Sequence, residues 1–234
     1  MRGIAVVAGK DVTSRTPRTP RGRTQREVGE TANAPRVFGI ETMATMTITV
    51  RRSGPDDRPA ILALMRAARG EGLSPAERAE RGFVQGTMDD QVLARFQDGP
   101  GVFVAEEDGA LAGFAMTSLP GAVSSGPPKL AVDAVAGGAQ APERPFLYGP
   151  AAVDPRFQGR GALTAMLTAL CRDLRERFDR GVAFVEAANE KSLAVHRHYE
   201  MTEAARFDHA DREYLVFTFD PDAFGTRLAP GKST

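Results

Sequence analysis

Hydrophobic and polar positions follow regular patterns from residue 47 onward. The run 47–52 predicts a strand, and the segment Pro55-Asp56-Asp57 opens a helix that continues through Ile61 and Met65. A second helical region is predicted from Ser74 to about Phe96, because Ser74 can cap it and Pro75 suits its first position. Gly82 and Gly86 interrupt this region. We expect residues 82–86 to form a bent loop, which is a candidate entry point for a substrate.

The next elements are a hairpin and a long connection. Two apolar runs, 102–105 and 111–116, surround an Asp-Gly turn signal and predict two antiparallel strands. The segment 120–145 is rich in Gly, Pro, Ala and Ser and is long for a connection within a compact domain. It is either a flexible excursion or a lid, and residues 130–135 fit a short strand or a short helix equally well.

Residues 146–153 predict a strand that is interrupted in its middle. Gly149 and Pro150 cannot both serve a regular central ladder, because proline lacks an N–H and glycine weakens the strand. We therefore expect local splaying or a bulge at this point.

The clearest helix follows residue 161. Six apolar residues recur on one of its faces: Leu163, Met166, Leu167, Leu170, Leu174 and Phe178. Cys171 lies beside this face, and we interpret it as a core residue because no His or Asp partner is near it in the sequence. A buried-type strand over 182–187, a helix from Asn189 to about His198 and a closing strand pair, 204–207 with 214–219, complete the pattern. This order predicts an α/β or α+β fold with a mixed sheet.

The chain divides into three segments. Residues 1–46 are rich in Arg, Thr, Pro and Gly without an apolar period, so they predict a disordered extension. Met43 and Met46 stand just before the first predicted strand. The alternative to a disordered extension is that translation of the native protein starts downstream of residue 1. A basic arm that touches phosphate is a weaker hypothesis, because glutamates dilute its charge. Residues 47–221 form the expected domain, and 222–234 are expected to be a flexible tail.

Composition excludes several classes of partner. The 30 basic and 30 acidic side chains cancel, so no overall positive field attracts nucleic acid or anionic lipid. The lone Cys171 allows no intramolecular disulfide and no zinc cluster. No apolar run approaches the roughly 18 residues of a membrane span, and no secretory signal pattern opens the chain. We expect a cytoplasmic protein without a metal, a nucleic-acid partner or a membrane partner.

The candidate chemistry lies at residues 153–163, where a strand ends, a glycine-rich turn follows and a helix begins. Gly159 and Gly161 allow backbone N–H groups to converge, the helix N-terminus adds a partial positive charge, and Arg160 adds a full one. This arrangement predicts an anion site that suits a pyrophosphate. The alternative is a tight turn with an exposed arginine. A nucleotide-binding protein is disfavoured, because the Lys-Ser/Thr of a P-loop and a Rossmann glycine pattern after the first strand are missing.

This run resembles the central motif of the GNAT superfamily of N-acetyltransferases, Arg/Gln-x-x-Gly-x-Gly/Ala after a strand that ends in Val-x-Pro. Gln158 and Gly161 match the motif, and Leu163 departs from it where the family has Gly or Ala. The order of elements from about residue 47 to residue 220 is also similar to that family. The resemblance implies a mixed, mostly antiparallel central sheet with a splayed central strand, flanked by helices.

The resemblance also implies acetyl-CoA as co-substrate, with its pantetheine arm on the splayed strand and its diphosphate at the glycine-rich turn. The cofactor-binding residues expected on this basis are Ala151, Ala152, Val153, Gln158, Gly159, Arg160, Gly161, Ala162 and Leu163. Asn189 is a further candidate, either as a ligand of the cofactor or as the cap of the helix that follows it.

Two residues compete for the role of general acid. A second family motif, Asn-x-x-Ser/Ala-x-x-x-Tyr-x-x-x-Gly-Phe, resembles residues 189–201, where His196 takes the tyrosine position and Tyr199 follows three residues later. Register favours His196. Chemistry favours Tyr199, because a phenol with a reference pKa of about 10 keeps its proton at neutral pH. The alternative is that both side chains only pack. Tyr148, Glu186 or water are the candidates for the base.

The expected function is transfer of an acetyl group from acetyl-CoA directly to a primary amine of a small molecule or peptide. The alternative is a catalytically silent acyl-CoA-binding module, which Leu163 and the substituted acid position suggest. Nothing in the sequence selects the acceptor amine. The resemblance makes a homodimer a reasonable assembly.

Overall fold

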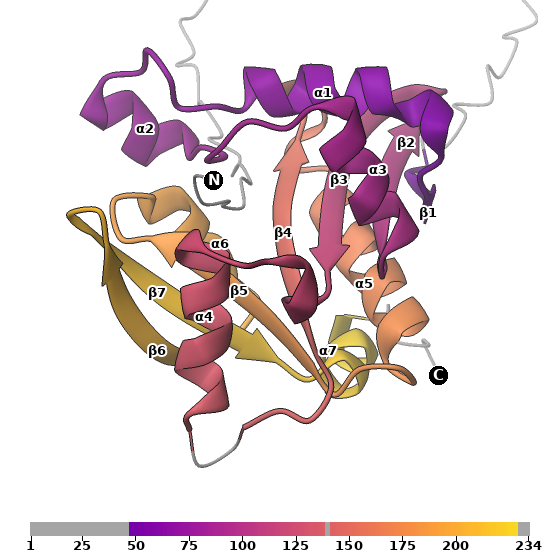
Figure 1. Ribbon diagram of the computed structural model, residues 1–234. Helices are drawn as coiled ribbons and strands as arrows, with labels where there is room; N and C mark the ends of the chain where they lie inside the picture. The colour runs from indigo at the N-terminus through magenta and orange to yellow at the C-terminus, as the bar shows by residue number, and fades with distance from the viewer. Residues whose placement is uncertain (1–46, 139–140, 229–234) are drawn as a thin grey trace, which may run out of the picture.

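The computed structural model describes residues 47–138 and 141–228, which form a seven-stranded sheet with helices on both faces (Figure 1). The strand order is β1-β2-β3-β4-β5-β7-β6, and every neighbouring pair is antiparallel except β4 with β5. The strands are β1 (Thr49–Arg52), β2 (Gly101–Glu107), β3 (Ala110–Ser118), β4 (Pro145–Val153), β5 (Arg180–Glu186), β6 (Thr202–His209) and β7 (Arg212–Phe219). The expected mixed, mostly antiparallel sheet is confirmed. The predicted N-terminal extension, 1–46, lies outside the described residues.

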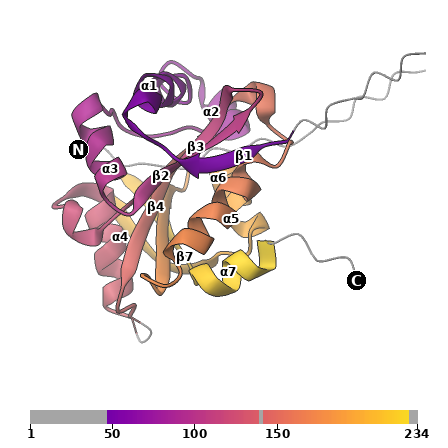
Figure 2. The same cartoon turned by 90° about the vertical axis from the view of Figure 1, so that its right-hand side faces the viewer.

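Seven α-helices belong to the described part of the chain. They are α1 (Arg58–Ala67), α2 (Pro75–Arg81), α3 (Asp90–Asp98), α4 (Gly126–Ala136), α5 (Ala162–Leu174), α6 (Glu190–His198) and α7 (Pro221–Leu228). Helices α5 and α7 cover one face of the sheet, and α1, α3 and α4 cover the other (Figure 2). No helix among the described residues has both the length and the apolar character needed to cross a membrane.

Side chains alternate between the two faces, as the period of a β-strand requires. On β5, Val182 and Phe184 pack under α4, whereas Ala183 and Val185 join the core under α5. Cys171 is fully buried in the α5 core, where it was expected. The sheet therefore separates two packed layers, and a residue's place along a strand decides which layer it reaches.

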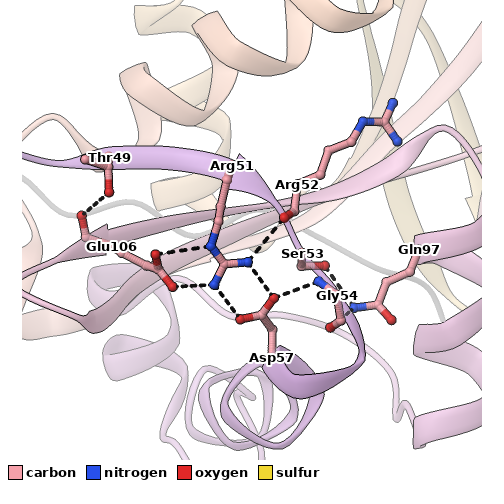
Figure 3. Close-up of polar contacts among 8 residues, drawn as sticks. All are labelled: Thr49, Arg51, Arg52, Ser53, Gly54, Asp57, Gln97 and Glu106. Atoms are coloured by element: carbon pink, nitrogen blue, oxygen red, sulfur yellow. Dashed lines mark hydrogen bonds and ion pairs between the residues drawn. The ribbon is translucent and has the colours of Figure 1, made fainter.

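A polar cluster fixes β1 to the rest of the domain (Figure 3). The Arg51 guanidinium donates to Glu106 on β2 at 2.5 Å and to Asp57 at 2.7 Å. The pairing with Arg51 lowers the pKa of the Asp57 carboxyl, which also accepts from the Gly54 amide at 2.7 Å. The cluster joins the first strand, its neighbour and the turn that leads into α1.

The long connection over 120–145 contains a packed helix. Prolines at 127 and 128 occupy the first turn of α4, where a missing N–H costs nothing. Ala131 and Val135 are buried against the sheet together with Phe184. Of the alternatives that the sequence left open, residues 126–136 therefore form a helix that is part of the hydrophobic core.

The expectation of a flexible tail over 222–234 is wrong for residues 222–228, which belong to α7. Asp220 Oδ1 accepts from the amides of Asp222 and Ala223 at 2.9 and 3.2 Å, which caps the helix. The Phe224 ring is 2% exposed, and its centroid lies 4.8 Å from that of Phe219. Capping and the burial of one aromatic ring hold this short helix in place, although its sequence shows little periodicity. Residues 229–234 lie outside the described part of the chain.

Candidate active site

The central strands β4 and β5 part from each other along their length (Figure 1). They pair only over Pro145–Leu147 and Arg180–Val182, after which β4 follows β3 and β5 follows β7. Between the pairs Thr117–Tyr148 and Ala115–Ala151, β4 carries one residue more than β3. This bulge contains Pro150 and Gly149, whose φ of +114° suits glycine. The splaying predicted from Gly149 and Pro150 is confirmed.

The parted strands leave backbone groups of β4 facing a gap. The Asp154 amide donates to Ala112 O of β3 at 2.9 Å, so Asp154 and, two residues earlier, Ala152 point their backbone toward β3. Ala151 and Val153 therefore face the gap, and Gln158 Nε2 donates to Val153 O at 3.4 Å. Of the three β4 residues expected to bind pantetheine, Ala151 and Val153 present their backbone to the gap, and Ala152 does not.

The start of α5 forms the predicted turn. Gly159 and Gly161 have φ values of +77° and +82°, a region that L-residues with side chains rarely adopt. The Ala165 amide donates to Gly161 O at 2.9 Å and begins the helical ladder. The amides of residues 162–164 lie in the first turn of the helix, where no carbonyl of a preceding turn accepts from them. They are therefore available to an anion. The Leu163 side chain, 5% exposed, lies in the core, and its amide is one of these three.

A cavity of about 360 Å³ lies between this turn and α6. Its wall includes Val153, Gln158, Gly159, Gly161, Ala162, Leu163 and Thr164, and from α6 and its end Lys191, Ala194, Val195, His198 and Tyr199. A second cavity, of about 460 Å³, shares Val153, Gln158 and Lys191 with the first and extends to the connection after α1. We call the two together the cofactor hollow. Lys191 is a cation in this wall that the sequence analysis missed, because no local pattern distinguishes it from a solvated lysine.

The charge of Arg160 is paired with a carboxylate outside the cofactor hollow. Its Nη1 donates to Glu107 Oε2 at 2.7 Å, and Glu107 is buried at the end of β2. The Arg160 side chain lines neither part of the cofactor hollow. The ion pair fastens the glycine-rich turn to the β2–β3 hairpin, and the cations in the wall of the hollow are instead Lys191, Arg69 and Arg81.

Asn189 uses both ends of its amide within the protein. Its Oδ1 accepts from the Ser192 amide at 3.2 Å and caps α6, and its Nδ2 donates to Phe83 O at 2.8 Å. The Val84 amide donates to Ala68 O at 2.9 Å. The capping alternative therefore describes Asn189, which also holds the 82–86 loop between α1 and α6.

His196 and Tyr199 occupy different environments. His196 is 1% exposed, its ring centroid lies 5.0 Å from that of Phe217, and its Nδ1 lies 2.7 Å from Ser192 O. A carbonyl only accepts, so Nδ1 carries the proton, and Nε2 has no partner among the described residues. The Tyr199 hydroxyl bonds Thr164 Oγ1 at 2.8 Å, and both residues line the cofactor hollow. The structure thus brings Tyr199 to the start of α5 and leaves His196 in the core.

Burial shifts both groups toward their neutral forms. It lowers the pKa of His196 to about 4 and raises the pKa of Tyr199. The candidate bases also lie apart from the hollow. Glu186 accepts from Arg212 at 3.0 Å, and Tyr148 is buried with no hydrogen-bond partner for its hydroxyl among the described residues.

The buried His196 predicts a loss of stability in acid. The unfolded imidazole takes a proton near pH 6.5, whereas the folded one stays neutral to about pH 4. The contribution of neutral His196 to the free energy of unfolding is therefore complete above pH 6.5 and declines as the pH falls toward 4. Between pH 7.5 and 5, we expect the free energy of unfolding to fall by about 2 kcal/mol more for the wild type than for His196→Gln. Urea unfolding at both pH values measures this difference, and parallel losses in the two proteins would contradict it.

Comparison with known proteins places this geometry in a family. Residues 64–200 match the model of the acetyltransferase (GNAT) family. No curated protein matches the chain significantly. Similar solved structures include yncA of Salmonella typhimurium with its cofactor acetyl-CoA (TM-score 0.51, 18% identity, 75% of this chain and 94% of that one). Another is the ribosomal-protein-S18-alanine N-acetyltransferase of Escherichia coli, with a TM-score of 0.51 and 17% identity over 80% of this chain and 99% of that one. The ribosomal-protein-alanine N-acetyltransferase of Brucella melitensis has a TM-score of 0.52 and 20% identity over 74% of this chain and 99% of that one.

The family match covers more than half of the chain and includes the parted strands, the glycine-rich turn, α5 and α6. The similar structures share the fold that the sequence predicted. The chain therefore belongs to the GNAT family of acetyltransferases.

Proposed function

We propose that the protein transfers an acetyl group from acetyl-CoA directly to a primary amine of a small molecule or a peptide. The observation that carries this proposal is that one cavity of the cofactor hollow has both the start of α5 and Val153, at the end of β4, in its wall. The acetyl-CoA in the Salmonella typhimurium structure supports the co-substrate. The names of the Escherichia coli and Brucella melitensis enzymes, which act on a ribosomal protein, support a peptide acceptor.

The residues of the hollow suit the parts of acetyl-CoA. The amides of residues 162–164 and the Lys191 ammonium group bind the diphosphate, because a helix N-terminus and a cation both favour negative charge. The backbone of Val153, in the wall of the hollow, and that of Ala151, buried two residues earlier on the same free edge of β4, accept the pantetheine arm. Arg160, whose own amide donates to Phe157 O at 3.4 Å, holds the turn through Glu107.

Transfer then requires a nucleophile and an acid. The neutral amine attacks the thioester carbonyl carbon, the C–S bond breaks, and the departing thiolate takes a proton. Tyr199 supplies this proton in our proposal, because its phenol lines the hollow and burial keeps it protonated. Water carries the proton released by the amine. His196 does not fit this role, because its proton is held by Ser192 O and its ring lies in the core.

A matched pair of variants tests the binding site. Apart from Gly161 and its two chain neighbours, no residue has an atom within 4 Å of the position that a Cβ would take at Gly161, and Asn and Asp both tolerate its left-handed backbone. Gly161→Asp and Gly161→Asn differ only in charge. We expect the aspartate to weaken acetyl-CoA binding by roughly tenfold or more relative to the asparagine, because it faces the diphosphate. Calorimetric titration measures both dissociation constants.

The outcomes separate the alternatives. Equal affinities in the two variants would exclude the α5 turn as the diphosphate site. Acetyl-CoA binding by the wild type without release of free thiol across a broad panel of amines would favour the silent acyl-CoA-binding module. We also propose a cytoplasmic location and a homodimer, which rest on the single cysteine and on the family resemblance, respectively.

A further inference from the structure

A third cavity, of about 320 Å³, lies on the other side of the 82–86 loop from the cofactor hollow. Gly82 borders the hollow, and residues 83–86 line the third cavity, so the loop separates the two spaces. The opposite wall comes from the β6–β7 hairpin and from Tyr214 on β7. Tyr214 pairs in register with Glu186, the last residue of β5, and α6 begins four residues later. The third cavity and the cofactor hollow thus approach the same end of β5.

Gln85 brings an unsatisfied donor to this cavity. The side chain is 8% exposed, and its Oε1 accepts from the Tyr214 hydroxyl at 3.4 Å. Its Nε2 is buried without a partner among the described residues. An unpaired buried donor is unfavourable, so a ligand oxygen that accepts a hydrogen bond from Nε2 gains binding free energy.

Arg78 brings an uncompensated charge to the same cavity. Its guanidinium lies 4.1 Å from the centroid of the Phe83 ring, and no carboxylate among the described residues is within ion-pair distance of it. The other charged groups in the wall are paired: Glu71 with Arg69 at 3.2 Å, and Arg212 with Glu186 at 3.0 Å. Apart from the His209 imidazole, the groups that are left over are Arg78 and the Gln85 amide, and both are donors.

We propose that the third cavity is the acceptor pocket and that it selects amines that also carry a carboxylate. The carboxylate accepts from Gln85 Nε2 and pairs with Arg78, since a guanidinium binds carboxylate strongly when both are partly desolvated. The amine is then directed toward the end of β5, which the third cavity and the cofactor hollow both approach. This inference rests on the proposed acetyl transfer, and it names the class of acceptor.

Matched acceptors test the proposal. Alanine is compared with alaninamide, and glycylglycine with glycylglycinamide, by release of free thiol from acetyl-CoA. In at least one of the two pairs, we expect kcat/KM to be higher for the free acid by roughly tenfold or more, because a charged hydrogen-bonded pair is lost in the amide. The pair with the larger ratio shows whether a free amino acid or a peptide terminus supplies the carboxylate.

Variants locate the effect. Gln85→Glu keeps the size of the side chain and an acceptor for Tyr214 but replaces the donor by a carboxylate, so the preference for the acid is lost. Arg78→Gln removes the charge that pairs with the carboxylate. The ratio of kcat/KM for the acid to kcat/KM for its amide then falls to within about threefold of one. Arg66→Gln, exposed on α1 and outside the described cavities, keeps the wild-type ratio.

Calorimetric binding of the same four compounds in the presence of CoA gives a readout that does not need turnover. If neither acid binds more tightly or reacts faster than its amide, the proposal is overturned, whereas release of thiol would still support acetyl transfer. If an acid binds more tightly through Arg78 and Gln85 but no thiol is released, the pocket stands and the proposed transfer fails.

Discussion

Replacing Tyr199 by phenylalanine is expected to lower kcat by roughly 100-fold or more, the usual scale for the loss of a general acid. The variant removes a hydroxyl that bonds Thr164 Oγ1 at 2.8 Å and lines the cofactor hollow, while the ring remains packed near Phe224. The dissociation constant of acetyl-CoA should change by less than about threefold, because the hydroxyl acts on the leaving thiolate and not on the diphosphate. Steady-state thiol release and calorimetric titration give the two quantities.

His196→Gln is the matched control at the competing position. It changes the residue that the family register favours, and its site is fully buried away from the hollow. We expect kcat at pH 7.5 to stay within about threefold of the wild type. A large loss of kcat in His196→Gln with full activity in Tyr199→Phe would return the role of acid to His196.

The two candidates also show where sequence reasoning about the site reached its limit. Register along the helix distinguishes positions by face, but Tyr199 is the capping residue at the end of α6, beyond the regular turns. Its direction depends on Thr164 in α5 and on Arg227 in α7, which donates to Tyr199 O at 2.8 Å. Neither contact is visible from residues 189–201 alone, so the motif left the acid undecided.

Local signals were sufficient for much of the rest. Gly149 and Pro150 predicted the interrupted strand because their backbone restrictions act wherever the chain places them. The glycines at 159 and 161 predicted the turn for the same reason. The side chain of Arg160 was misplaced, because its partner Glu107 is 53 residues away and the pair forms only when the β2–β3 hairpin meets the turn. Backbone features were predictable, and long-range charge pairing was not.

The helix α7 provides the largest expected effect on stability. Phe224→Ala should reduce the free energy of unfolding by about 3–5 kcal/mol, the range for truncation of a buried aromatic ring. The ring lies against Phe219, and α7 approaches α5 so closely at Gly225 that a Cβ there would come within 3.0 Å of Cys171 Cβ. The structure therefore cannot close the cavity easily. Urea unfolding at pH 7.5 measures the change.

Thr226→Ala is the control on the same helix, and its exposed position predicts a change within about 0.5 kcal/mol. Because Arg227 of α7 holds the backbone of Tyr199, Phe224→Ala should also lower kcat while leaving acetyl-CoA binding largely intact. A loss of stability below about 1 kcal/mol would mean that residues 221–228 fray in solution, as their sequence suggested. Tyr199 would then be positioned by Thr164 alone, and the activity of Phe224→Ala would equal that of the wild type.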